Sequence, residues 1–197
     1  ALAGERPGLE RLGLHVLHSG RRQEELRGRA LELAADLALR PRAGELGMAR
    51  DLVGMSSAFG PHEALELLRA LLAVVERGSG DPWARREWDL AFLGALERAQ
   101  RTAEHLVAAR AAAERHADDQ QFQTLYARAL AASGDLDGAL GWLAAQDERE
   151  LPRYERQALR DAILDLCWNG YRLEEVVRRF EAWDAADPAS VSGESCW

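Results

Sequence analysis

The sequence predicts an all-α fold built from helical hairpins. Strand signals are nearly absent, because Ile163 is the only isoleucine and β-branched residues do not occur in runs. Residues 122–146 read instead as two short amphipathic helices around the turn Ser133-Gly134-Asp135, where Gly134 can adopt a positive φ. A lone hairpin of this size cannot bury its apolar face, so it needs neighbours of the same kind. We therefore expect an α-solenoid of repeated hairpins.

Five hairpins follow one another at a nearly constant period. The small or apolar residue near the start of each second helix recurs after 38, 39, 36 and 37 residues, which is typical of a repeat array. An irregular bundle of helices with similar lengths is the alternative. We expect antiparallel hairpins over about residues 8–39, 45–77, 83–116, 120–147 and 152–187, with 189–197 as a tail or the start of a further unit; the recurring residues are Leu26, Ala64, Ala103, Ala139 and Val176.

Proline and glycine mark most of the expected boundaries. The first helix of the second hairpin should run over residues 45–59, and Pro61 fits the first position of the next helix. Residues 78–82 contain two glycines and a proline, which indicates an inter-hairpin loop or a domain boundary. The third hairpin turns at residues 100–102 without a glycine, whereas Asn169-Gly170 should turn the fifth.

Composition excludes several classes of function. The chain has a net charge of −8 and no lysine, so all 25 of its cations are arginine. Acidity argues against a nucleic-acid surface, and the lack of lysine excludes a phosphate-loop or Schiff-base lysine. No apolar run approaches the ~18 residues of a membrane span, so we expect no membrane insertion. Because the chain starts on Ala1 without a signal peptide, we expect a processed protein or part of a longer one. Its arginine- and alanine-rich composition is typical of a GC-rich bacterium, with the cytoplasm and the periplasm both left open.

The residues that could carry chemistry do not form a catalytic or metal site. His15 and His18 lie one helical turn apart but lack a third ligand nearby in the sequence. Residues 54–58 contain serines, yet a nucleophile elbow needs a preceding strand and two glycines. Cys167 fits a buried thiol, and its pairing with Cys196 in an oxidising compartment stays open. We therefore expect no catalytic residues, no metal, no cofactor and no enzyme.

The tryptophans divide into two groups. Trp88, Trp142 and Trp183 follow the packing periodicity and are expected in the core between helices. Trp83 begins a helix after a proline, and Trp168 lies near a turn. Core packing is the favoured interpretation for these two as well, with a role as exposed anchors for a partner as the alternative.

The fourth and fifth hairpins carry a recurring set of small and apolar residues. The fourth has Tyr126-Ala127, Gly134-Asp135, Ala139 and Leu143, and the fifth has Val176, Phe180, Trp183 and Pro188. These residues resemble the signature positions of the tetratricopeptide repeat, a helix–turn–helix family with a 34-residue period, with one extra residue in the turn of the fifth hairpin. The match covers about residues 120–188 and is weak elsewhere. The resemblance implies a right-handed superhelix whose concave face holds a peptide or a folded partner.

This resemblance suggests a non-catalytic scaffold or adaptor that binds another protein. Such arrays occur in bacterial regulators, assembly factors and envelope machinery, including exopolysaccharide export. Two alternatives remain from the sequence alone. One is an RNA-binding array similar to the pentatricopeptide family, against which acidity and the lack of lysine count. The other is a helical domain that regulates a larger enzyme.

In this repeat family the first helix of each hairpin lines the concave side. On these first helices, the residues that do not pack against other helices should therefore face the partner. The arginines among them would form a positive strip on an acidic protein, which suits an acidic segment or surface of a partner protein. The expected partner-binding residues are Arg85 and Trp88 in the third hairpin, Gln121, Thr124 and Arg128 in the fourth, and Gln157 and Arg160 in the fifth.

Overall fold

The computed structural model describes residues 23–40, 43–78, 81–147 and 151–186, and this part of the chain is helical without strands. It divides into two compact units between Arg101 and Thr102, which is the turn expected inside the third hairpin. The expected helix before residue 23, His15, His18 and Cys196 lie outside the described residues.

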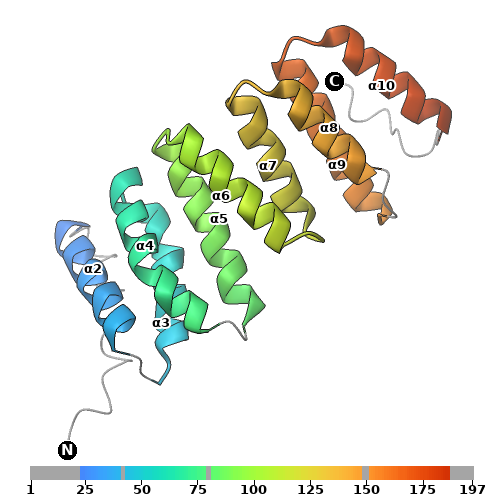
Figure 1. Cartoon of the computed structure of the whole chain (residues 1–197). Coiled ribbons are helices and arrows are strands. Elements are labelled where there is room, and N and C mark those ends of the chain that lie inside the picture. The colour runs from blue at the N-terminus through green and yellow to red at the C-terminus, as the bar shows by residue number, and fades with distance from the viewer. Residues whose placement is uncertain (1–22, 41–42, 79–80, 148–150, 187–197) are drawn as a thin grey trace, which may run out of the picture. The chain divides into compact units, whose positions relative to one another are not determined.

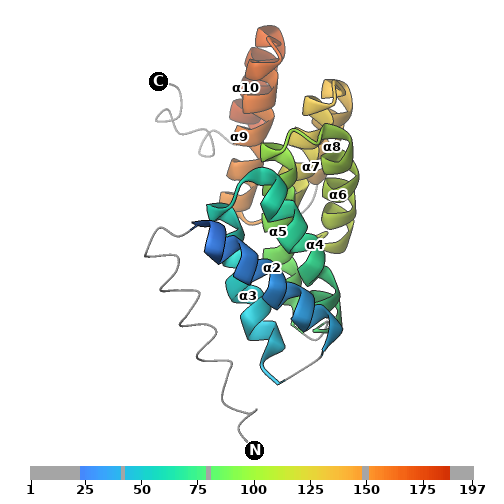
Figure 2. The same cartoon turned by 90° about the vertical axis from the view of Figure 1, so that its left-hand side faces the viewer.

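The first unit holds four α-helices and one short 3-10 helix in its described part. Helix α4 packs against α2, α3 and α5, so it forms the centre of the unit (Figures 1 and 2). Its buried residues include Leu65, Leu68 and Leu71, and they supply much of the core. The elements are α2 (Gln23–Leu39), α3 (Glu45–Met55), η1 (Ser56–Ala58), α4 (Pro61–Arg77) and α5 (Pro82–Arg98).

The second unit holds five α-helices in its described part (Figure 1). Helix α9 contacts both α7 and α8, and the three share one core that includes Ala139, Leu143, Leu159 and Ile163. Helix α10 packs against α9 through Val176 and Trp183. The elements are α6 (Thr102–Arg115), α7 (Gln120–Ala132), α8 (Leu136–Asp147), α9 (Arg153–Asn169) and α10 (Leu173–Ala186).

The expectation of a helix over residues 45–59 is wrong at its end. Helix α3 stops at Met55, η1 follows, and Phe59 has an extended backbone. The hydroxyl of Ser56 donates a hydrogen bond to the carbonyl of Val53 at 2.7 Å. Serine often bonds its own backbone in this way and weakens helix continuation. Pro61 does occupy the first position of α4, as expected.

Three helices end in the same kind of turn. In each, one residue has a positive φ and the following amide donates to a carbonyl five residues earlier, as in a Schellman motif. Gly134 was expected to play this part, but the turn of the fifth hairpin is centred one residue later than Asn169-Gly170, and two of the three residues are not glycine. The residues with positive φ are Gln100 (54°), Gly134 (96°) and Tyr171 (56°), and the bonded pairs are Arg101–Leu96, Asp135–Leu130 and Arg172–Cys167.

Two buried or half-buried side chains complete the ends of other helices. The amide of Gln123 is buried and donates to the carbonyls of Ala113, His116 and Ala117 at 3.0–3.3 Å, at the end of α6. The guanidinium of Arg77 donates to the last carbonyls of α2. Helix ends leave carbonyls without partners, so these side chains replace water there.

Some of the tryptophans that were expected in the core are buried and others are exposed, and the cysteine is buried. Trp88 is buried, and Trp142 and Trp183 pack against the core of the second unit, as predicted. Trp83 and Trp168 are exposed, so the favoured prediction of core packing is wrong for both. Cys167 is buried as a free thiol, and burial raises its pKa.

Candidate functional site

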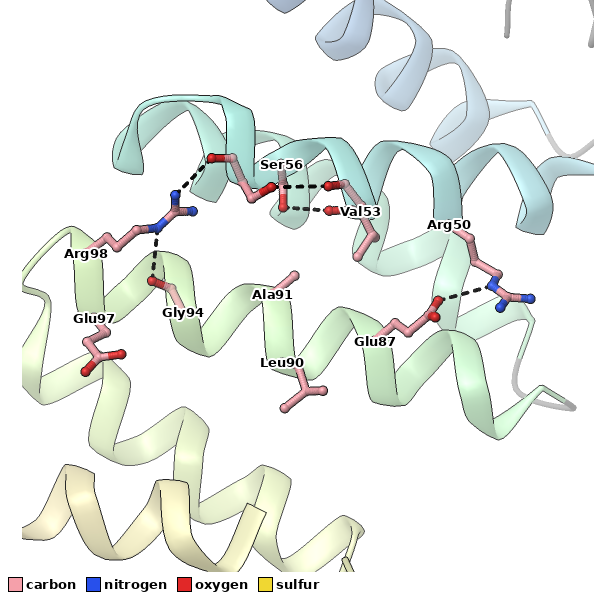
Figure 3. A pocket seen from close by; sticks show the side chains of 11 residues that line it. Arg50, Val53, Ser56, Glu87, Leu90, Ala91, Gly94, Glu97 and Arg98 are labelled. Atoms are coloured by element: carbon pink, nitrogen blue, oxygen red, sulfur yellow. Dashed lines mark hydrogen bonds and ion pairs between the residues drawn. The ribbon is translucent and has the colours of Figure 1, made fainter. Parts of the chain in front are cut away.

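A groove of about 640 Å³ runs between α3 and α5 in the first unit (Figure 3). Its walls come from two stripes of residues at helical i, i+3, i+4 and i+7 spacing, one on each helix. Arg50 and Ser57 on the first stripe contact Glu87 and Arg98 on the second, so the two helices run in the same direction. The lining residues are Arg50, Val53, Gly54, Ser56 and Ser57 from α3 and η1, and Glu87, Leu90, Ala91, Gly94, Glu97 and Arg98 from α5.

Small residues keep this groove open. A Cβ added at Gly54 or at Gly94 would meet no other atom within 4 Å, so both positions border empty space. Ala91 lies one turn from Gly94, and Val53 and Leu90 supply further apolar lining. The middle of the groove is therefore apolar and accessible to another chain.

Each end of the groove has an arginine, and the two arginines bind different kinds of partner. Arg50 forms an ion pair with Glu87 at 3.1 Å and approaches Asp81 at 3.9 Å. Arg98 donates instead to two backbone carbonyls, those of Ser57 at 3.2 Å and Gly94 at 3.3 Å. Among the described residues no carboxylate lies within ion-pair distance of Arg98, and Figure 3 shows Glu97 pointing away from it. Arg98 therefore keeps N–H donors without a carboxylate partner at this end of the groove, which Glu97 also lines.

The two partner residues expected in α5 do not line this groove. The indole of Trp88 is buried, stacks on Phe92 and donates to the carbonyl of Leu68 in α4 at 2.7 Å. Arg85 lies over the Trp88 ring at 4.8 Å and bonds the buried carboxylate of Asp89 at 3.3 Å. Both side chains serve packing, because α4 covers this face of α5. Trp88 is therefore corrected from a partner contact to a core residue.

The three partner residues expected in α7 differ in exposure. Gln121 and Arg128 are exposed on α7, and Arg128 has no charged partner among the described residues. Thr124 is half-buried and donates to the carbonyl of Gln120.

Both expected residues of α9 are engaged within the unit. Gln157 donates to Asp161 at 2.9 Å. The side chain of Arg160 is only 12% exposed, pairs with Asp147 at 3.4 Å and lies over the ring of Trp183 at 5.0 Å. Arg160 is thus corrected from a partner contact to a link between α9, α10 and the end of α8. The expected positive strip is reduced to Arg128 in this unit.

Sequence reasoning missed the residues that line the α3–α5 groove. A usable signal was present, since Gly54, Ala91 and Gly94 are small residues at regular helical positions on two first helices. A pattern of bulky or charged side chains does not indicate such an opening, because the opening is defined by the absence of large side chains.

Two absences hold for the described part of the chain. No group of three or more His, Cys, Asp or Glu side chains there is placed to hold a metal ion. None of the described helices combines the length and the apolar character needed to cross a membrane. Comparisons with protein-family models, curated proteins and solved structures found no match for this chain.

Proposed function

We propose that this chain is a non-catalytic protein-interaction scaffold, built as a tetratricopeptide-like α-solenoid of antiparallel helical hairpins. It holds an extended segment of a partner protein in the α3–α5 groove. The observation that carries the proposal is that groove, which lies between the first helices of the second and third expected hairpins. The repeat resemblance assigns partners to the first helices of the hairpins, which supports this choice of groove, although Arg85 and Trp88 do not line it.

Size and lining suit a peptide. A volume of about 640 Å³ lies within the range of sites that enclose ligands, roughly 300–1,000 Å³. Gly54, Ala91 and Gly94 let a partner backbone approach the helices closely, and Val53 and Leu90 offer apolar contact. A segment with small or medium apolar side chains satisfies both features.

Arg98 adds a preference for acidic residues. A guanidinium has five N–H donors in a rigid fork, and the two bonds to Ser57 and Gly94 hold it in place. The remaining N–H groups can donate to a carboxylate, and charge-assisted bonds of this kind are about twice as strong as neutral ones. The bound segment accordingly combines apolar residues with an aspartate or glutamate at the Arg98 end.

Selection from a phage-displayed library of random 12-residue peptides on the full chain tests this proposal. Enriched peptides should join apolar residues to Asp or Glu. Gly94→Leu fills the groove and should weaken their binding at least tenfold, or about 1.4 kcal/mol. Gly28→Leu is the matched control, because Gly28 is an exposed helical glycine in α2 whose added Cβ also meets open space.

A double-mutant cycle isolates the role of Arg98. Arg98→Gln should weaken an acidic peptide severalfold, whereas it should leave the peptide's Asn or Gln analogue nearly unchanged. Fluorescence anisotropy of labelled peptides measures both. Equal binding by the Gly94→Leu and Gly28→Leu proteins would refute the groove, and equal losses for the acidic and amide peptides would refute the acidic preference.

A further inference from the structure

The last two helices of the second unit leave an apolar surface uncovered. Helix α10 contributes no fully buried residue, although it is amphipathic. Trp168 is 65% exposed, Leu173 is 52% exposed and Val177 is 55% exposed. Phe180 follows on the same side of α10 and is half-buried. We call Trp168, Leu173, Val177 and Phe180 the end surface.

The same unit contains an equivalent surface that is covered. The turn residues Gly134 and Tyr171, both with positive φ, are 37 residues apart, which sets the correspondence between the two helix pairs. A shift of 37 residues relates Val177, which is 55% exposed, to Leu140, which is 5% exposed. The full set of equivalents of the end surface is Ala131, Leu136, Leu140 and Leu143, and all four belong to or pack against the core of the second unit.

A covering helix accounts for the difference. Helix α9 contacts both α7 and α8 and closes the equivalent surface. In the first unit α5 contacts both α3 and α4 in the same way. Within the described residues no helix stands in this relation to α9 and α10. The end surface therefore has the form that the fold itself uses to receive a helix.

Charge around the end surface selects the kind of helix. Asp165 lies one turn before Trp168, and Glu174 and Glu181 each follow a residue of the α10 stripe. All three carboxylates are exposed and have no ion-pair partner among the described residues. The surface is therefore bordered by free negative charge.

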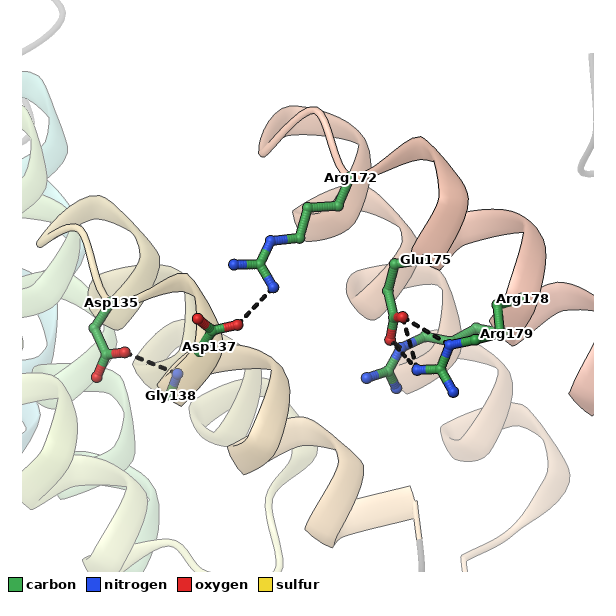
Figure 4. A network of polar contacts seen from close by, with 7 residues as sticks. All are labelled: Asp135, Asp137, Gly138, Arg172, Glu175, Arg178 and Arg179. Atoms are coloured by element: carbon green, nitrogen blue, oxygen red, sulfur yellow. Dashed lines mark hydrogen bonds and ion pairs between the residues drawn. The ribbon is translucent and has the colours of Figure 1, made fainter.

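The nearby arginines are already engaged. Arg172 pairs with Asp137 on α8, and Arg178 and Arg179 both bond Glu175 within α10 (Figure 4). Arg178 and Arg179 share the single carboxylate of Glu175, so this cluster keeps one positive charge. With the three exposed carboxylates included, the region still carries two net negative charges. A partner that supplies cations next to its apolar stripe would match this border.

We propose that the end surface binds a basic amphipathic helix of a partner protein. The helix lays an apolar stripe over Trp168, Leu173, Val177 and Phe180, and places arginine or lysine against Asp165, Glu174 and Glu181. This is helix-in-groove recognition, in which apolar anchors give affinity and flanking charges give orientation. The site lies in the second unit and does not depend on the proposed α3–α5 groove.

A displayed library of helical peptides tests the inference on the full chain. The peptides share a leucine stripe and have random residues at the flanking positions. Clones sorted for binding should carry Arg or Lys at those flanks. Leu173→Ser with Val177→Ser should weaken them at least tenfold, and Glu174→Gln with Glu181→Gln should reduce both their affinity and its salt dependence.

Val107→Ser provides the matched control, because Val107 is a 70% exposed valine on α6 of the same unit. The inference fails if sorted clones bind the Leu173→Ser/Val177→Ser protein as tightly as the Val107→Ser protein. It also fails if acidic flanks are enriched. Light scattering that reveals a dimer, dissociated by Val177→Ser, would instead assign the surface to a second copy and overturn the proposal.

Discussion

Helices α4 and α10 share an amphipathic pattern, but the apolar face of α4 is buried and that of α10 is partly exposed. Helix α4 buries seven residues and packs against α2, α3 and α5. Helix α10 buries none and packs against α9. The difference lies in the number of neighbours and not in the helix itself. An amphipathic stripe gives a helix an apolar face that is stabilised by burial. Whether that face is buried depends on the arrangement of the neighbouring helices.

The largest expected effect concerns a fully covered position of the second unit. Ala139 is completely buried in its core, and Ala139→Glu would place a charge there without a partner. Such a change should cost several kcal/mol, roughly 3–5. Amide exchange should show loss of protection in α7, α8 and α9. Ala145→Glu, at an exposed position of α8, is the control and should leave protection intact.

A pair of truncations tests the contrast between covered and uncovered positions directly. Leu140→Ala should destabilise by about 2–4 kcal/mol, because it opens a cavity in the core. Val177→Ala, at the equivalent position of α10, should cost at most about 0.5 kcal/mol, as at other exposed sites. Urea denaturation measures both. Similar costs would mean that Val177 is covered in solution.

The next largest loss of stability is expected at the buried polar residue Gln123. Gln123→Met keeps the volume but removes the donor that serves the carbonyls at the end of α6. Leaving those carbonyls buried without a bond should cost about 1–3 kcal/mol. Gln157→Met, at a half-buried position that bonds a side chain, should cost much less. Thermal melting compares the two, and equal shifts would contradict the capping role.

The turns allow a test in both directions. Gln100 holds a positive φ, so Gln100→Gly should stabilise the chain by about 1 kcal/mol. Gly134→Ala should destabilise by a similar amount, because Gly134 has φ 96° and its Cβ site is otherwise open. If both substitutions destabilise, side-chain contacts of Gln100 outweigh the strain of its backbone.

The smallest effect is a pH dependence confined to the end of the second unit. Hydrogen bonding by Arg172 lowers the pKa of Asp137, and bonding by Arg178 and Arg179 lowers the pKa of Glu175. A carboxyl group with a lowered pKa stabilises the fold above its unfolded pKa, near 4, and loses this effect as pH falls through the folded value. Amides of α10 should exchange faster over that window. Asp137→Asn with Glu175→Gln should flatten the response.

Sequence reasoning named no residue that lines the α3–α5 groove. It assigned partners to the first helices of the hairpins, and the α3–α5 groove lies between two of them. It chose Trp88 and Arg160, which the structure uses for packing. Spacing alone defines two possible stripes on α5, and only the bond from Trp88 to Leu68 in α4 decides which stripe faces inward. A binding opening made by glycine and alanine also carries no side chain to recognise.

The sequence by itself determined the helices, most of their boundaries and the small buried residues such as Ala139, because 3.6-residue periodicity, proline and glycine act locally. It also determined the acidic, lysine-free character of the surface. The tertiary structure decided what depends on neighbours. It placed Arg160 against Trp183, gave positive φ to Gln100 and Tyr171, opened a groove at Gly94 and left Val177 uncovered. Burial is a property of pairs of helices, and no single stretch of sequence contains both members of the pair.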